Sequence, residues 1–267
     1  LPLLKFLSLS GLNGTIPKEI WNLTHLEKLT LSHCSLTGSL PPQLGVLFRV
    51  LDLSNNFLSG DIPSYSSNLQ SLNLKCNWFC GSIPVSLGQM GGLTSRNNRF
   101  TGNIPTTLGH ISNLRFLYLG NNFLTADVLK NMTSLRFVSL SHNKFEGELP
   151  KSLSQEIKYI IISDNNFSGK IPSFLSHFKD ITVLSIGGNR FHGPIPNWLW
   201  NMTHLRILDL SRNKFEGCLS GSINQLDAFK HDDDILQWTG ILRYDQERLI
   251  MVRSPLMLMV KGRELQF

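Results

Sequence analysis

The segment Leu205-Arg-Ile-Leu208-Asp-Leu210-Ser-Arg-Asn213-Lys-Phe215-Glu-Gly217 decides the fold of this chain. Its pattern of Leu-x-x-Leu-x-Leu, Asn and Gly recurs in nine full copies, with steps of 21 to 24 residues between successive glycine positions. A period of this length is typical of a solenoid, in which each repeat forms one coil and packs on its neighbours. The glycine position holds Gly38, Gly60, Gly81, Gly102, Ala126, Gly147, Gly169, Gly193 and Gly217.

In each copy the Leu-x-Leu pair alternates with other residues, which is the period of a strand with one buried face. Stacked copies therefore predict one parallel sheet along the inner wall of the solenoid. The residues expected to point into the core are Leu29 and Leu31, Leu51 and Leu53, Leu72 and Leu74, Leu117 and Leu119, Val138 and Leu140, Ile160 and Ile162, Leu184 and Ile186, and Leu208 and Leu210.

An asparagine follows the second leucine of each pair by three residues. Its amide both donates and accepts hydrogen bonds, so we expect a structural ladder that pairs backbone groups inside the turns. The ladder positions are Asn56, Asn77, Asn98, Asn122, Asn143, Asn165, Asn189 and Asn213, and Cys34 stands there in the first full copy, where a buried thiol is expected. A proline three residues after the glycine fixes φ where the chain turns outward.

Composition excludes several classes of protein. Of the 267 residues, 41% are hydrophobic and 16% charged, which argues against disorder. The net charge is +6, but Lys and Arg are scattered and form no basic run, so we expect no nucleic-acid partner and only a mild attraction to acidic partners or acidic polysaccharide.

We expect no enzyme activity, no cofactor and no metal. The sequence has no Gly-x-Ser-x-Gly, His-Glu-x-x-His, phosphate-loop or kinase pattern. The cluster His231-Asp-Asp-Asp234 lacks the spaced ligands of a calcium loop. The four cysteines, Cys34, Cys76, Cys80 and Cys218, allow three full disulfide pairings, and their spacing does not choose among them.

Five Asn-x-Ser/Thr sequons predict N-glycosylation and hence an extracellular chain. Three of them, at Asn22, Asn131 and Asn201, lie four residues before the same repeat leucine, in one outer slot. The full set is Asn13, Asn22, Asn131, Asn166 and Asn201.

The ends and two copies depart from the pattern. Ser95 replaces the second inward leucine and predicts a weak point in the core, while Ala126 and the missing proline after it predict a different outer turn. We expect the solenoid to span residues 1–219 and a non-repeat segment to span 220–267. Within that segment Pro255–Val260 is far shorter than the roughly 20 residues of a membrane span and is predicted to form a strand that packs back on the solenoid. Because the first coil lacks a polar cap, we expect the chain to start inside a longer protein.

Residues that alternate with the inward leucines point out of the inner wall. Large apolar side chains gather at these positions in three adjacent copies, which predicts one exposed patch that binds a ligand. The alternative is that these rings only cover the sheet or contact the C-terminal segment. The predicted ligand-binding residues are Phe116, Tyr118, Phe137, Tyr159 and Ile161, with Lys75 and Arg96 on the N-terminal side.

The phrase Leu58-Ser-Gly60-Asp-Ile62-Pro63 resembles the plant-specific class of leucine-rich repeats found in cell-surface receptor kinases, receptor-like proteins and polygalacturonase inhibitors. The resemblance covers about four-fifths of the chain. The segment Met259-Val-Lys261-Gly262-Arg-Glu264-Leu-Gln-Phe267 is similar to the end of the non-repeat island of plant receptor-like proteins. The implied fold is an α/β leucine-rich-repeat solenoid, a curved right-handed superhelix with a parallel inner β-sheet and short 3-10 or irregular outer segments.

The resemblance implies the ectodomain of a plant receptor-like protein with a role in defence or development. It would bind a peptide or protein ligand on the concave face, signal through adaptor and co-receptor kinases, and reach the plasma membrane through a segment beyond residue 267. A soluble inhibitor of a wall-degrading enzyme is an alternative, although such inhibitors carry a Cys-paired cap directly after the repeats and this chain continues past Cys218 with a long segment. Two further alternatives are the ectodomain of a receptor kinase and a truncated product that does not signal.

Overall fold

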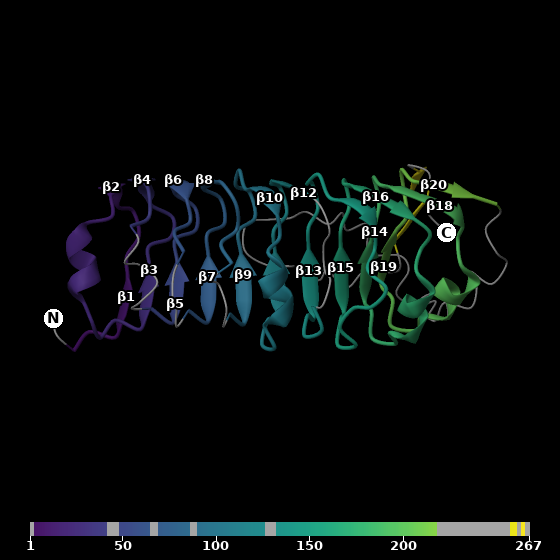
Figure 1. The fold of residues 1–267 in the computed structure, drawn as a ribbon, viewed down its shortest axis with the longest axis horizontal. Coiled ribbons are helices and arrows are strands. Elements are labelled where there is room, and N and C mark those ends of the chain that lie inside the picture. The colour runs from purple at the N-terminus through teal and green to yellow at the C-terminus, as the bar shows by residue number, and fades with distance from the viewer. Residues whose placement is uncertain are drawn as a thin grey trace, which may run out of the picture.

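The protein winds coil upon coil into an elongated solenoid, in which coil order follows sequence order (Figure 1). The computed structural model describes residues 3–41, 48–64, 69–85, 90–125, 132–217, 257–260 and 263–264. Coils are numbered here by their inner strand. A shortened copy at residues 1–17, which precedes the nine full copies, is coil 1, and the copy quoted above is coil 10. The predicted leucine-rich-repeat solenoid is confirmed.

The inner wall is one sheet of 12 strands, each paired with the next along the chain. All these pairs are parallel except the last, β21–β22, which is antiparallel. The strands are β1 (Phe6–Ser8), β3 (Lys28–Thr30), β5 (Val50–Asp52), β7 (Ser71–Asn73), β9 (Gly92–Thr94), β11 (Phe116–Tyr118), β13 (Phe137–Ser139), β15 (Tyr159–Ile161), β17 (Val183–Ser185), β19 (Ile207–Asp209), β21 (Met257–Val260) and β22 (Arg263–Glu264).

The core is a set of columns that run the length of the array. Register places like residues opposite each other, as Leu29 opposite Leu51 and Leu51 opposite Leu72, and the inward residues predicted above are all buried. A second column of buried leucines and phenylalanines lies two residues after the ladder position, and the phenylalanines of adjacent coils stack. Phe79 and Phe100 have ring centroids 6.4 Å apart, and Phe145 and Phe167 6.1 Å.

Each ladder asparagine joins its own coil to the preceding one. Asn98 donates from Nδ2 to the carbonyl oxygens of Leu74 and Ser95, at 2.8 and 3.2 Å, and its Oδ1 accepts from the amide of Phe79 at 3.0 Å. Equivalent bonds recur at the other seven positions. In place of the first asparagine, the buried Cys34 thiol lies 3.5 Å from the carbonyl oxygen of Ser32.

Outer strands form a second row along one edge, at the top of Figure 1 for β2 to β12. These strands pair in parallel within β2 to β8, within β10 and β12, and within β14 to β20. They are β2 (Asn13–Thr15), β4 (Ser35–Gly38), β6 (Phe57–Asp61), β8 (Trp78–Cys80), β10 (Thr101–Asn103), β12 (Phe123–Thr125), β14 (Glu146–Glu148), β16 (Asn166–Gly169), β18 (Arg190–Pro194) and β20 (Lys214–Glu216).

Four described helices, all 3-10, start after a proline whose φ lies between −58 and −67°. Proline sets this φ in advance, which explains why the chain turns at the same place in these four coils. The helices are η1 (Lys18–Asn22), η3 (Thr106–His110), η4 (Ser173–His177) and η5 (Asn197–Asn201).

The irregular copies have definite positions. Ser95 is buried, and its Oγ has no hydrogen-bond partner, so the predicted weak point lies in the core. Ala126, the acidic cluster at 231–234 and Cys218 lie outside the described residues. The strand predicted at Pro255–Val260 is confirmed over Met257–Val260 as β21, which pairs with β19 and extends the inner sheet, while residues 255 and 256 lie outside the described residues. The boundary at residue 219 stays a prediction.

Candidate ligand-binding face

The candidate site is the solvent-facing side of the inner sheet, here called the concave face. Strand pairing sets Phe116 of β11 opposite Phe137 of β13, and Phe137 opposite Tyr159 of β15. Ile161 lies two residues after Tyr159 on the same side of β15. The structure therefore brings the predicted residues of coils 6 to 8 together.

The prediction that all five of these side chains are exposed is wrong. Phe116 is 45% exposed, but Phe137 and Ile161 are each only 4% exposed, and Tyr118 and Tyr159 are half-buried. The cause is ring packing, because the centroid of Phe137 lies 4.4 Å from that of Tyr118 and 5.2 Å from that of Tyr159. The strand period correctly predicted that these side chains point out of the sheet. How far each one is buried depends instead on the side chains of neighbouring coils that pack against it.

The apolar cluster also extends further than predicted. Val183 of β17 is buried with Phe137 and Ile161, and Ile207 of β19 packs against them half-buried. The sequence signal was available, since the residue before the first inward leucine is apolar in each of coils 6 to 10. Lys75 and Arg96 lie half-buried in coils 4 and 5, on the N-terminal side as predicted, and both make contacts within the protein.

A hydroxyl and carboxylate network lies beside this cluster. The Ser163 and Ser185 hydroxyl oxygens are 2.5 Å apart, and the Ser185 hydroxyl donates to Asp209 Oδ2 at 3.3 Å. The other oxygen of Asp209 accepts from the amide and hydroxyl of Ser211. A Cβ added at Gly187 would overlap the Asp209 carboxylate, so Gly187 makes room for it.

The residue before each ladder asparagine forms a row at the rim of the concave face that the sequence analysis missed. In coils 2 to 8 and 10 this residue is not glycine, and its φ is positive, between 50 and 58°. Asn, Asp and His tolerate this backbone better than other side chains do, which is the signal that could have found the row. Asp164 sits in it between His142, at 3.5 Å, and Arg212, at 2.8 Å, and the pair with Arg212 spans Gly188 of the coil between them.

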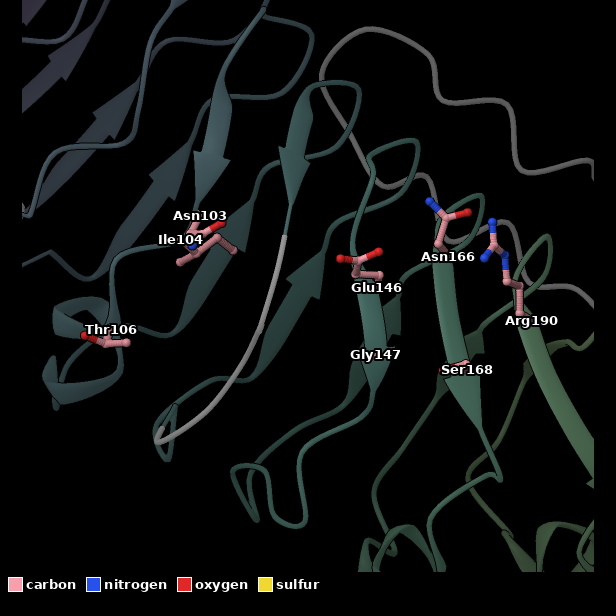
Figure 2. A pocket seen from close by; sticks show the side chains of 8 residues that line it. All are labelled: Asn103, Ile104, Thr106, Glu146, Gly147, Asn166, Ser168 and Arg190. Atoms are coloured by element: carbon pink, nitrogen blue, oxygen red, sulfur yellow. The ribbon is translucent and has the colours of Figure 1, made fainter.

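A cavity of about 570 Å³ lies away from the concave face, among outer strands (Figure 2). Figure 2 shows Asn103, Ile104 and Thr106 on one side and Glu146, Asn166 and Arg190 on the other, with Gly147 and Ser168 completing the lining. None of the predicted ligand-binding residues lines it.

The sequons differ in exposure. Asn22 and Asn201 are exposed at the last residues of η1 and η5, Asn13 is exposed in β2, and Asn166 is half-buried in β16. Asn131 lies outside the described residues. The described residues contain no group of three or more His, Cys, Asp or Glu placed to hold a metal ion, and none of their helices has the length and apolar character of a membrane span. In the described part of the chain the thiols of Cys34, Cys76 and Cys80 are not in disulfides.

Comparisons with known proteins agree with this geometry. Leucine-rich-repeat family models match residues 155–215, 25–47, 48–69, 68–90 and 134–155, together more than half of the chain. Receptor-like protein 39 of Arabidopsis thaliana is 33% identical over 154 residues, which is 56% of this chain and 13% of that protein. Receptor-like protein 41 of the same plant is 30% identical over an equal length.

Two solved structures are similar over most of the chain. The Arabidopsis receptor kinase HAESA, in complex with the peptide hormone IDA and the co-receptor SERK1, is 34% identical with a TM-score of 0.75, and the match covers 80% of this chain and 38% of that one. The plant peptide hormone receptor RGFR1, in complex with RGF2, is 26% identical with a TM-score of 0.80 over 96% of this chain and 40% of that one. The chain thus spans well under half the length of these relatives. It belongs to the leucine-rich-repeat family and is related within it to the plant receptor-like proteins.

Proposed function

We propose that this chain is an extracellular ligand-recognition module of a plant cell-surface receptor, and that its concave face binds a peptide or protein ligand. The observation that carries the proposal is the aromatic strip of Phe116, Tyr118 and Tyr159, in which Phe137 lies between Phe116 and Tyr159 and both tyrosines pack against the buried Phe137 and Ile161. Packed rings lose little conformational freedom on binding, and aromatic anchors dominate the energetics of interfaces. The complexes of HAESA and RGFR1 with peptide hormones support the same kind of ligand for this chain.

The wider role is part of the proposal. By its relation to receptor-like proteins, the chain would be held at the outer side of the plasma membrane by a segment that lies elsewhere in the protein. It would signal in defence or development through an adaptor kinase and a co-receptor kinase. Lys75 and Arg96 would lie beside the bound ligand on its N-terminal side, and the sequons would carry glycans.

The test uses peptides selected from a displayed random library for binding to the 267-residue chain. Phe116, Tyr118 and Tyr159 are then changed together to Ala, and the Kd of a selected peptide is measured. Three aromatic contacts of about 1–2 kcal/mol each predict a loss of affinity of about 100-fold or more.

The matched control changes Phe57, Trp78 and Phe123 to Ala, which removes three exposed rings from the outer strands instead. Its affinity is expected to stay within about threefold of the unchanged chain. Equal losses of affinity in the two triple variants would show that the concave face is not the binding surface. Normal binding by the concave-face variant, with circular dichroism showing that this variant is folded, would show the same.

A further inference from the structure

A second line of aromatic and cationic side chains follows the outer edge in coils 3 to 7, one residue after the ladder asparagine. In coils 3 to 7 these residues are Phe57, Trp78, Arg99, Phe123 and Lys144, here called the edge row. All five are exposed, and the three rings retain 43 to 48% of their accessible surface. Large exposed rings in a row are unusual on a soluble surface unless they contact something.

The edge row contains the same unit twice. The Arg99 guanidinium lies over the Trp78 ring, 5.7 Å from its centroid, and the Lys144 ammonium lies over the Phe123 ring at 5.4 Å. Phe57 enlarges the first unit, since its ring centroid is 5.2 Å from that of Trp78. Trp78 and Phe123 are two coils apart, so the units repeat at about 10 Å, twice the spacing of paired strands.

Each unit offers two kinds of contact. A guanidinium that lies on a ring keeps its N–H groups at its edge, where they can bind a carboxylate with two hydrogen bonds. The exposed parts of the rings offer an apolar surface to the C–H face of a sugar. Within the described part of the chain, the ion pairs are made by other basic residues, and neither Arg99 nor Lys144 is in one.

We propose that the edge row binds an acidic polysaccharide, a linear chain of sugar acids. Such a polymer presents ring faces and carboxylates at regular intervals, as the two units do, and the net charge of +6 attracts a polyanion. The choice of a sugar polymer over a single-stranded nucleic acid rests on the proposed extracellular function, because aromatic and cationic rows also suit stacked bases.

The two units are not equivalent. Glu146 lies exposed two residues after Lys144, and its negative charge opposes the binding of a carboxylate ligand there. Near the first unit, Asp61 lies opposite Cys80, at the other end of β8 from Trp78. The Trp78–Arg99 unit therefore contributes more to binding, and Arg99→Gln weakens it more than Lys144→Gln does.

The experiment measures the binding of polygalacturonate to the 267-residue chain at low and at physiological salt. Arg99 and Lys144 are changed together to Gln and compared with Lys158→Gln plus Arg206→Gln, which removes the same charge from exposed positions beside the inner sheet. The edge-row variant is expected to bind about tenfold more weakly, and the control within about twofold. Trp78→Leu with Phe123→Leu keeps the charge and an apolar side chain, and several-fold weaker binding is expected.

Three results would overturn the proposal: equal losses in both charge variants, unchanged binding in the Leu variant, or no binding at low salt. Binding of polyglutamate or oligo-dT as tight as that of polygalacturonate, through the same side chains, would identify a general polyanion surface instead. The concave-face variant, with Phe116, Tyr118 and Tyr159 changed to Ala, is expected to bind polygalacturonate normally. Failure of the polysaccharide proposal and failure of the proposed peptide-binding function would therefore be seen in different variants.

Discussion

Ser95 is a polar residue in the column of inward leucines. It occupies the column of Leu74 and Leu119, is 1% exposed, and its hydroxyl has no partner. A buried unsatisfied hydroxyl is destabilising, so we expect Ser95→Ala to raise the free energy of unfolding by about 1 kcal/mol. The measurement is the urea midpoint followed by circular dichroism.

Ser54→Ala is the control, because Ser54 is similarly buried but its hydroxyl donates to Asp52 Oδ1 at 2.7 Å. Loss of that bond is expected to lower the free energy of unfolding by about 1 kcal/mol. If both substitutions changed the free energy of unfolding in the same direction, the hydrogen bonding of these hydroxyls would not be what determines the change in stability.

The ladder gives a second comparison between single residues. Asn98→Ala leaves the buried amide of Phe79 without its acceptor and removes one of the two asparagine donors from each of the carbonyl oxygens of Leu74 and Ser95, and a cost of about 2–3 kcal/mol is expected. Cys34→Ala removes only weak thiol contacts at 3.5 and 3.8 Å, so it is expected to cost less than about 1 kcal/mol. Urea midpoints of both variants test the order, and an equal loss would contradict the ladder's energetic role.

Between elements, Glu156 connects neighbouring coils through charge. Its carboxylate accepts from Arg136 Nε at 2.8 Å and from Arg115 Nη1 at 2.6 Å. The hydrogen bond from Arg136, with the positive charge of Arg115, lowers the pKa of Glu156 below its usual 4.5. A lowered folded pKa stabilises the fold above the unfolded value, and this stabilisation is lost as pH falls through the folded value.

Glu156→Gln is therefore expected to lower the thermal midpoint slightly at neutral pH and to match the unchanged chain near about pH 2. All three side chains are substantially exposed, so the difference should shrink in about 1 M salt. A difference that is constant from neutral pH to acid would show that packing, not charge, connects these coils.

The elements also show what sequence could and could not predict. The inward leucines, the asparagine ladder and the parallel inner sheet follow from period alone, since each coil repeats one local solution. The burial of Phe137 and Ile161 did not follow, because it depends on how Tyr118, Tyr159 and Val183 pack from adjacent coils. The edge row was readable in the same frame, one residue after the ladder, but its ring–cation contacts required coordinates.

Across the whole molecule, three surfaces can be distinguished. The concave face carries the aromatic strip, the outer edge carries the edge row, and Asn22 and Asn201 end 3-10 helices that belong to neither. Sugars attached at Asn22 and Asn201 would therefore leave both proposed binding surfaces open. Asn166 differs, because it is half-buried and lines the cavity beside Arg190 (Figure 2).

For protein secreted from plant cells, we expect glycans at Asn13, Asn22 and Asn201 and an unmodified Asn166, since a glycan there would have to fit against the lining of that cavity. Enzymatic release of N-glycans in heavy-oxygen water, followed by mass spectrometry, marks each formerly modified asparagine. Asn22→Gln and Asn201→Gln should each remove one glycan without changing peptide or polygalacturonate binding. Unmodified Asn22 and Asn201 in secreted protein, or binding that depends on their glycans, would contradict this division of the surface.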